Sequence, residues 1–230
     1  IKTTLLDKIL SDERLFNNLG FMKETGRIIK YTNTKEQAEI KTALLDKILS
    51  DERLFNNPDF MQYAGEIIDS SYTEEQAELA NRILSDERLF NNPDFMKETG
   101  RIINYTDTKE QAELANRILS DERLFNNPYF MQYAGSIIWS TKTEEQADLT
   151  NRILSDERLF NNPDFMKEAI VIINNANTKE CVGLTNRILS DERLFNNPDF
   201  MKEASEIIRS ILTKEQAEIK TAMLDKILSD

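Results

Sequence analysis

Residues 85–96 read SDERLFNNPDFM, and the same twelve letters recur at 50–61, 155–166 and 190–201. The first eight letters occur six times, and a truncated further copy closes the chain. The copies open at Ser11, Ser50, Ser85, Ser120, Ser155, Ser190 and Ser229, so the spacings are 39, 35, 35, 35, 35 and 39 residues. A fixed period of this size is typical of stacked helical repeats.

The first half of each repeat has the pattern of an amphipathic helix. In the repeat 73–107, Thr73 and Gln76 have the spacing of a capping box, which satisfies two backbone N–H groups at a helix start. With residues set 100° apart, the apolar and small residues between Gln76 and Leu84 share one face. Glu78 and Arg82 lie on the other face, at a spacing that supports an exposed helix.

The second half of the repeat begins where NNPDFM ends one helix and starts another. Asn91 is expected in the left-handed conformation that ends the preceding helix. Asn92 suits the N-cap, and Pro93 suits the first helical position because it has no N–H to donate. The apolar face of this second helix then consists of Phe95, Met96, Thr99, Ile102 and Ile103.

An alternative division of the repeat has three helices. Ser85, followed by the acidic Asp86 and Glu87, can cap a separate short helix over DERLFN. Both divisions place Leu89 and Phe90 at the turn. The main prediction remains two helices per repeat.

The chain is therefore predicted to be all-α, a superhelical α-solenoid of tandem two-helix, helix-turn-helix repeats with a period of 35 residues, or 39 at the ends. The 39-residue repeats gain four residues in the first helix, about one turn, so the apolar face keeps its phase. The period is close to that of tetratricopeptide and pentatricopeptide repeats, but the W-x₂-L-G-x₂-Y pattern is missing. We expect one array over 1–230, itself part of a longer array, made of a truncated repeat 1–33, full repeats 34–72, 73–107, 108–142, 143–177 and 178–212, and an unpaired helix 213–230.

Composition argues against several classes of function. The chain has no His and a single Cys, Cys181, so the common catalytic triads, His-based metal sites and an internal disulfide framework are absent. Cys181 stands where other repeats have Gln, and we expect a buried, inert thiol. Acidic pairs recur in nearly every repeat, which fits capping and surface charge better than one active site. We predict no enzymatic activity, no cofactor and no metal.

Net charge and hydropathy narrow the choice of partners. The net charge is −12, and nucleic-acid binding draws its affinity chiefly from Lys and Arg. Some helical repeats of similar length read single-stranded RNA, but the negative charge argues against a nucleic-acid partner here. No apolar run approaches the roughly 20 residues of a membrane span, so no span is expected.

Variation between repeats falls on two positions of the second helix, one on each side of an Ile pair. These positions are three residues apart and opposite the apolar face, so we expect them to form one exposed stripe. The stripe consists of Arg27, Lys30, Glu66, Asp69, Arg101, Asn104, Ser136, Trp139, Val171, Asn174, Glu206 and Arg209. A constant frame with a variable stripe is how stacked repeats display a ligand surface, and Trp139 is the expected anchor. Drift at solvated positions is the alternative explanation.

The predicted function is a non-enzymatic scaffold that binds protein or peptide partners through the stripe. The main alternative is a structural spacer within a long secreted or surface repeat protein, and a modular single-stranded nucleic-acid binder is less favoured. We also expect head-to-tail self-association, because the end helices lack a neighbouring repeat. The apolar residues expected to be uncovered there are Leu5, Ile9, Leu10, Leu224, Ile227 and Leu228.

Overall fold

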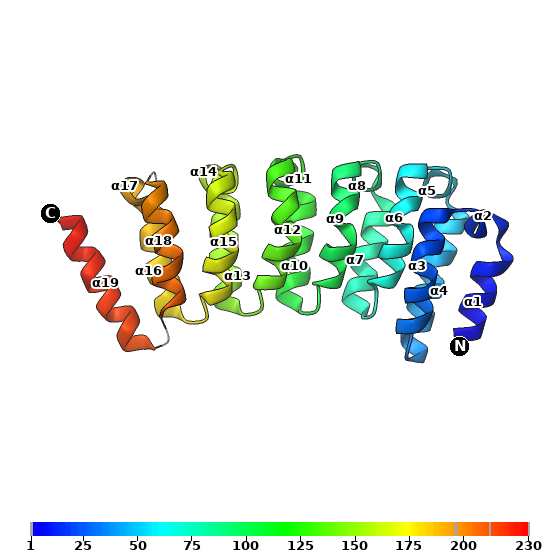
Figure 1. The fold of residues 1–230 in the computed structure, drawn as a ribbon, viewed down its shortest axis with the longest axis horizontal. Coiled ribbons are helices and arrows are strands. Elements are labelled where there is room, and N and C mark those ends of the chain that lie inside the picture. Colours follow the sequence, from blue (N-terminus) through cyan, green and yellow to red (C-terminus); the bar gives the residue numbers. More distant parts are fainter. Residues whose placement is uncertain (1, 196, 212, 230) are drawn as a thin grey trace. The chain divides into compact units, whose positions relative to one another are not determined.

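A computed structural model describes residues 2–195, 197–211 and 213–229, with side chains for all of these but 194, 195, 198, 201 and 227–229. Within these residues the chain forms helices and contains no strand (Figure 1). The prediction of an all-α protein is therefore confirmed for the described residues.

The chain divides within α12 (Pro128–Ser140) into two compact parts, residues 1–131 and 132–230. Besides the start of α12, the N-terminal part contains α1 (Lys2–Ser11), α2 (Glu13–Phe16), α3 (Leu19–Tyr31), α4 (Lys35–Ser50), α5 (Glu52–Phe55), α6 (Pro58–Asp69), α7 (Glu74–Ser85), α8 (Glu87–Phe90), α9 (Pro93–Asn104), α10 (Lys109–Ser120) and α11 (Glu122–Phe125). Besides the end of α12, the C-terminal part contains α13 (Glu144–Ser155), α14 (Glu157–Phe160), α15 (Pro163–Asn175), α16 (Lys179–Ser190), α17 (Glu192–Phe195), α18 (Pro198–Arg209) and α19 (Lys214–Ser229).

A complete repeat has a first helix, a short helix of four residues and a second helix, as α7, α8 and α9 show (Figure 1). The three-helix division is thus correct, and the main prediction of a two-helix repeat is wrong on this point. Asp86, and not Ser85, caps the short helix: its carboxylate accepts a hydrogen bond from the Arg88 N–H at 3.0 Å. Asn91 is not left-handed, with φ −92° and ψ 0°, because the short helix runs directly into the next N-cap.

The other helix ends follow the predicted capping chemistry. Thr73 and Gln76 form the full capping box at the start of α7. Asn92 caps α9, accepting a hydrogen bond from the Phe95 N–H at 3.0 Å, and Pro93 opens the helix. The four additional residues of a 39-residue repeat lengthen the first helix, so α4 has 16 residues where α10 has 12.

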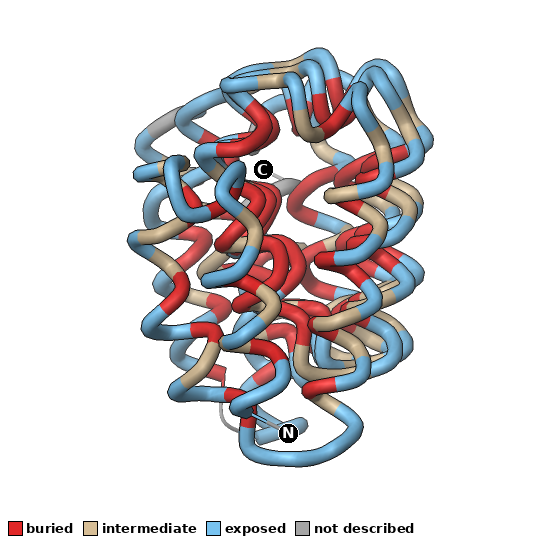
Figure 2. The backbone as a smooth tube through the Cα atoms, turned by 90° about the vertical axis from the view of Figure 1, so that its right-hand side faces the viewer, coloured by how far each residue is buried: buried red, intermediate tan, exposed pale blue. Residues whose placement is uncertain are grey.

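The core lies between first and second helices, and helices of the same kind in successive repeats also pack on one another. First helices pack on first helices, as α4 does on α7, and second helices pack on second helices, as α3 does on α6 and α15 on α18. Buried positions lie on the sides of the helices that face one another (Figure 2). Phe60 meets Phe90 of the next repeat edge-on with ring centroids 6.2 Å apart, and Phe95 meets Phe125 in the same way at 5.4 Å.

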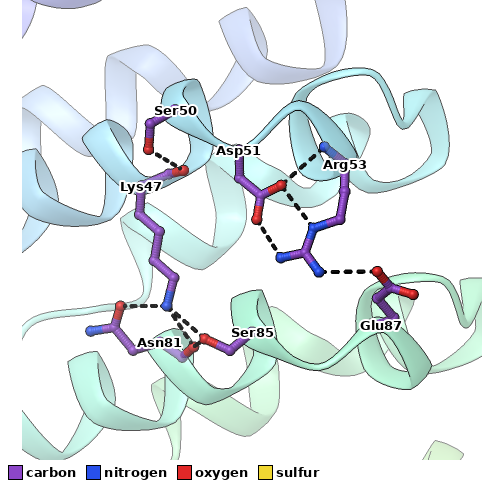
Figure 3. A network of polar contacts seen from close by, with 7 residues as sticks. All are labelled: Lys47, Ser50, Asp51, Arg53, Asn81, Ser85 and Glu87. Atoms are coloured by element: carbon purple, nitrogen blue, oxygen red, sulfur yellow. Dashed lines mark hydrogen bonds and ion pairs between the residues drawn. The ribbon is translucent and has the colours of Figure 1, made fainter.

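A polar ladder joins first helices of successive repeats (Figure 3). Lys47 Nζ donates to the Asn81 carbonyl at 3.0 Å and to Ser85 Oγ at 2.8 Å. Arg82 reaches the corresponding Asn and Ser of α10 in the same way. The sequence placed Arg82 beside Glu78 on an exposed face, whereas the structure directs its guanidinium to the next repeat.

The short helices carry a second rung of this ladder. Arg53 pairs with Asp51, the N-cap of its own short helix, at 2.6 Å and with Glu87 of the next repeat at 3.0 Å (Figure 3). All four residues of SDER therefore contribute, since the Ser and Glu accept from the preceding repeat, the Asp caps and the Arg donates. Exposed ion pairs of this kind add little stability each, but they fix how one repeat is placed on the next. This accounts for the close repetition of the stretch.

Candidate functional site

The twelve stripe positions differ in their exposure. Asp69 is buried, with 2 % of its surface exposed, and Glu66, Ser136 and Val171 are half-buried. The exposed members are Arg27, Lys30, Arg101, Asn104, Trp139, Asn174, Glu206 and Arg209. The expectation of exposure was therefore wrong for Asp69, and the reason lies in the helices around it.

In the N-terminal part, three successive second helices bring their stripe residues together. Arg27 on α3 pairs with the Asp69 carboxylate on α6 at 3.1 Å. Arg101 and Asn104 on α9 line the same surface cavity as these two residues and Glu66, and its volume is about 220 Å³. The equivalent stripe residues Arg27, Glu66 and Arg101, which are 39 and 35 positions apart in sequence, thus share one site.

Asp69 lies between charged side chains of two neighbouring helices, Arg27 on α3 and Lys41 on α4. Lys41 Nζ donates to the Asp69 carbonyl oxygen at 3.2 Å and lies 4.4 Å from the centre of the Tyr72 ring. Of the two Asp69 carboxylate oxygens, Oδ2 meets Arg27, and Oδ1 has no hydrogen-bond partner among the described residues. Burial raises the pKa of the Asp69 carboxyl, while the charges of Arg27 and Lys41 and the Tyr72 hydroxyl oppose the rise.

Lys41 is itself enclosed, with none of its surface exposed. Burial lowers the pKa of its ammonium group to about 8, the Asp69 carboxylate opposes the change, and the charge of Lys2 adds to it. On the cavity side, burial raises the pKa of Glu66, and the neighbouring Glu24 carboxylate adds to this, while Arg27 opposes it. The site therefore combines buried charges of both signs.

The 35-residue repeats have glutamine at the place of Lys41. Gln76 Nε2 donates to the Asn104 carbonyl at 3.3 Å, and Gln146 Nε2 donates to the Asn174 carbonyl at 3.3 Å. In each case the acceptor is the second stripe residue of the same repeat, so a donor on the first helix holds the end of the second helix. The sequence shows this relation only when the repeats are aligned on their serines, which places Lys41 opposite Gln76.

Cys181 interrupts this series. The thiol is buried, as predicted, with 2 % of its surface exposed. Thr178 still accepts a hydrogen bond from the Cys181 N–H at 3.2 Å, but α16 has no capping box because the thiol cannot replace the glutamine amide.

In the C-terminal part the stripe is less charged. Trp139 is 43 % exposed, and Lys142 Nζ lies 4.1 Å from the centre of its ring. Val171 is half-buried on α15, while Glu206 and Arg209 are exposed on α18 and lie 3.7 Å apart.

The apolar residues expected to be uncovered at the ends are only partly so. The structure buries Leu5, Ile9 and Leu224 against their neighbours, and Leu10 is 48 % exposed. The side chains of Ile227 and Leu228 lie outside the described residues. The larger exposed apolar side chains near the ends are Phe16, Leu19, Ile219 and Met223.

Among the described residues, no helix is both long and apolar enough to span a membrane. No group of three or more Cys, Asp or Glu in the described part of the chain has a geometry that could hold a metal ion.

Comparisons with models of known families, with characterised proteins and with solved structures find no match for this chain.

Proposed function

We propose that the repeats stack as an α-solenoid and act as a non-enzymatic scaffold, which binds a protein or peptide partner along the stripe. One observation carries the proposal: stripe residues from α3, α6 and α9 line one cavity, although they come from three different repeats. The repeated residues, by contrast, are occupied in the ladder and the core. Residues that differ between repeats are thus the ones left to face a partner.

The rigidity of the frame favours binding to a polypeptide. Successive second helices pack directly on one another, as α3 does on α6 and α6 on α9, so a partner meets a preformed surface and less side-chain ordering is needed on binding. The stripe offers both charges, polar amides and the exposed Trp139, a mixture suited to protein surfaces. A spacer would need the frame but would have no need of a shared cavity.

The test compares two triple variants with equal loss of positive charge. The stripe variant carries Arg27→Ser, Lys30→Ser and Arg101→Ser. The control variant carries Lys35→Ser, Lys109→Ser and Lys179→Ser, at exposed starts of first helices.

Tagged chains are used to capture partners, which are then identified by mass spectrometry and titrated as purified proteins. We expect the control variant to bind as the unchanged chain does, and the stripe variant to lose at least tenfold in affinity. Equal binding by both variants would refute a role for the stripe. Absence of any partner for the unchanged chain would favour the spacer.

A weak head-to-tail self-association is a second proposal, supported by the exposed Phe16 and Leu19 on one side and Ile219 and Met223 on the other. Sedimentation velocity over a range of concentrations tests it. Association should be visible in the unchanged chain and reduced by Leu19→Ser combined with Met223→Ser. A monomer at every concentration would contradict it.

A further inference from the structure

An apolar pocket lies between α16, α18 and α19. Its volume is about 200 Å³, and its lining includes Phe200 and Ile207 of α18 and Met223 of α19. Phe200 and Ile207 are half-buried, and Met223 is 61 % exposed. In the repeat of α7, α8 and α9 the equivalents of the first two residues, Phe95 and Ile102, are buried. Other repeats thus fill the place that this pocket leaves open.

The internal repeats show what fills this place. The Phe of each second helix is met edge-on by the Phe of the next short helix, as Phe60 is by Phe90 at 6.2 Å and Phe95 by Phe125 at 5.4 Å. The sequence 1–230 has no further ERLF stretch after α19. The group that fits the pocket is therefore a short helix of the repeat type, together with its second helix.

One short helix of the chain presents the matching face to solvent. Phe16 of α2 is 56 % exposed, whereas Phe90, at the same place in α8, is 2 % exposed. Leu19, the first residue of α3, is 79 % exposed. A second copy of the chain can thus offer α2 and α3 to the pocket.

The helix beside α2 and α3 decides how the copies can join. A short helix and a second helix pack beside the first helix of their own repeat, as α8 and α9 do beside α7. If α2 and α3 of a second copy cover the pocket, α19 becomes their first helix. This is the place that α1 holds in the second copy, where it packs on α2 and α3. One of the two helices must therefore leave.

The two helices are equivalent in sequence and can replace one another. Residues 1–12 and 219–230 are identical except at positions 4 and 5 of the first stretch. Lys8 of α1 pairs with Asp46 on α4, and Lys226 stands at the place of Lys8 in α19. The contacts that α1 makes can thus be made again by α19, which has 16 residues where α1 has 10.

We infer that two copies join head to tail by exchange of these helices: α19 of one copy takes the place of α1 in the next, and Phe16 of the next copy covers the pocket. The inference rests on the self-association proposed above and names the surfaces that form it. Exchange of an equivalent element is a low-cost route to association, because the lost contacts are replaced. The gain comes from covering the pocket together with Phe16 and Leu19.

Two equivalent lysines give a matched test by sedimentation velocity. Lys8→Glu places a carboxylate beside Asp46 of its own chain and loosens α1, whereas Lys226→Glu places one beside Asp46 of the second copy. We expect Lys8→Glu to tighten self-association at least threefold and Lys226→Glu to weaken it at least threefold, although both change the charge equally. Effects of the same sign, or no effect of either variant, would overturn the exchange.

The role of the pocket is tested with an exposed aromatic residue as the control. Phe16→Ser should weaken self-association at least tenfold. Tyr129→Ser should leave it unchanged, because Tyr129 is 59 % exposed but lies on α12, away from the residues that the exchange brings together. Equal effects of the two variants would contradict the place given to Phe16.

Hydrogen exchange followed by mass spectrometry reports on the released helix directly. As the protein concentration rises through the range of association, the amides of α1 should exchange at least fivefold faster, and those of residues 220–226 should exchange more slowly. Slower exchange in both helices would show stacking without helix exchange, so the inference would fail while the self-association stands. A monomer at every concentration would reject both.

Discussion

Replacing Lys41 by Gln tests the buried lysine beneath the stripe. The glutamine is what the 35-residue repeats have at this place, where Gln76 and Gln146 donate to the end of the second helix. Lys41→Gln therefore keeps a donor to the Asp69 carbonyl but removes a titrating group. The free energy of unfolding should then lose one component of its dependence on pH.

The sign follows from the direction of the pKa change. Burial lowers the pKa of Lys41 from 10.5 to about 8 in the folded chain. Below pH 8 the lysine is charged in both the folded and unfolded chains, so the cost of burying its charge is fully present. Between about pH 8 and pH 10.5 the folded chain releases the proton while the unfolded chain keeps it, so stability rises with pH in this window.

The expected size is about 2–3 kcal/mol between pH 7 and pH 10, since a tenfold difference in proton affinity corresponds to about 1.4 kcal/mol. Urea titrations followed by circular dichroism at pH 7, 8, 9 and 10 give the free energy of unfolding for both chains. As the pH rises from 7 to 10, the free energy of unfolding of the unchanged chain should increase by that amount relative to the free energy of unfolding of Lys41→Gln. In the folded chain Tyr72 stays neutral up to pH 10, because burial raises its pKa to about 12. In the unfolded chains tyrosine ionises equally in both proteins, so this contribution cancels in their difference.

A control separates this effect from the loss of any lysine. Lys35→Gln removes an exposed lysine from the start of the same helix and should leave the dependence on pH as it is in the unchanged chain. The reasoning is refuted if the difference between the unchanged chain and Lys41→Gln stays constant from pH 7 to pH 10. In that case Lys41 keeps its proton throughout and its burial costs less than the structure indicates.

Three further predictions test the frame by urea titration. Arg82→Ala should lower the free energy of unfolding by about 1–2 kcal/mol. Arg82→Lys should change it by less than about 0.5 kcal/mol, because α4 uses a lysine for the same contacts. Equal losses in the two variants would show that these contacts do not matter. Cys181→Gln should restore the capping box with Thr178 and raise stability by about 1 kcal/mol, and no gain would contradict the role given to glutamine here. Gly183→Ala should raise stability by up to about 1 kcal/mol. Gly65→Ala should lower stability, because a Cβ at position 65 would lie 2.7 Å from a glutamate side chain on α3. A loss for Gly183→Ala together with a gain for Gly65→Ala would count against the packing of α3 on α6.

Helix ends could be predicted because their signals are local. The capping box of Thr73 and Gln76 and the Asn-Pro start of α9 each depend on residues within one turn. The sequence left open whether DERLFN belongs to a two-helix repeat or forms a short helix of its own, and it gave the cap of that helix to Ser85. In the structure α7 continues through Ser85, so Asp86 takes the cap position.

The direction of Arg82 and the burial of Asp69 could not be predicted from one repeat. Helical periodicity places a residue on a face, but it does not say whether a neighbour 34 positions later offers a better partner. Asp69 had the phase of an exposed residue, but it is buried beside Arg27 of α3 and Lys41 of α4, which come from other helices. The exposure of most stripe positions followed from phase alone, whereas the shared cavity required the three-dimensional stacking of α3, α6 and α9.

The ladder has a genetic consequence. Lys47 and Arg53 find an Asn, a Ser and a Glu on the next repeat, and every 35-residue repeat offers the same three acceptors at the same places. An in-frame deletion of residues 73–107 would therefore give Lys47 the acceptors of α10 in place of those of α7. The contacts of the ladder would all be kept across the new junction. Unequal crossing-over between copies could lengthen, shorten or reorder the coding sequence while each product still folds. Such events would place different stripe residues side by side, so new surfaces would arise by recombination as well as by point mutation.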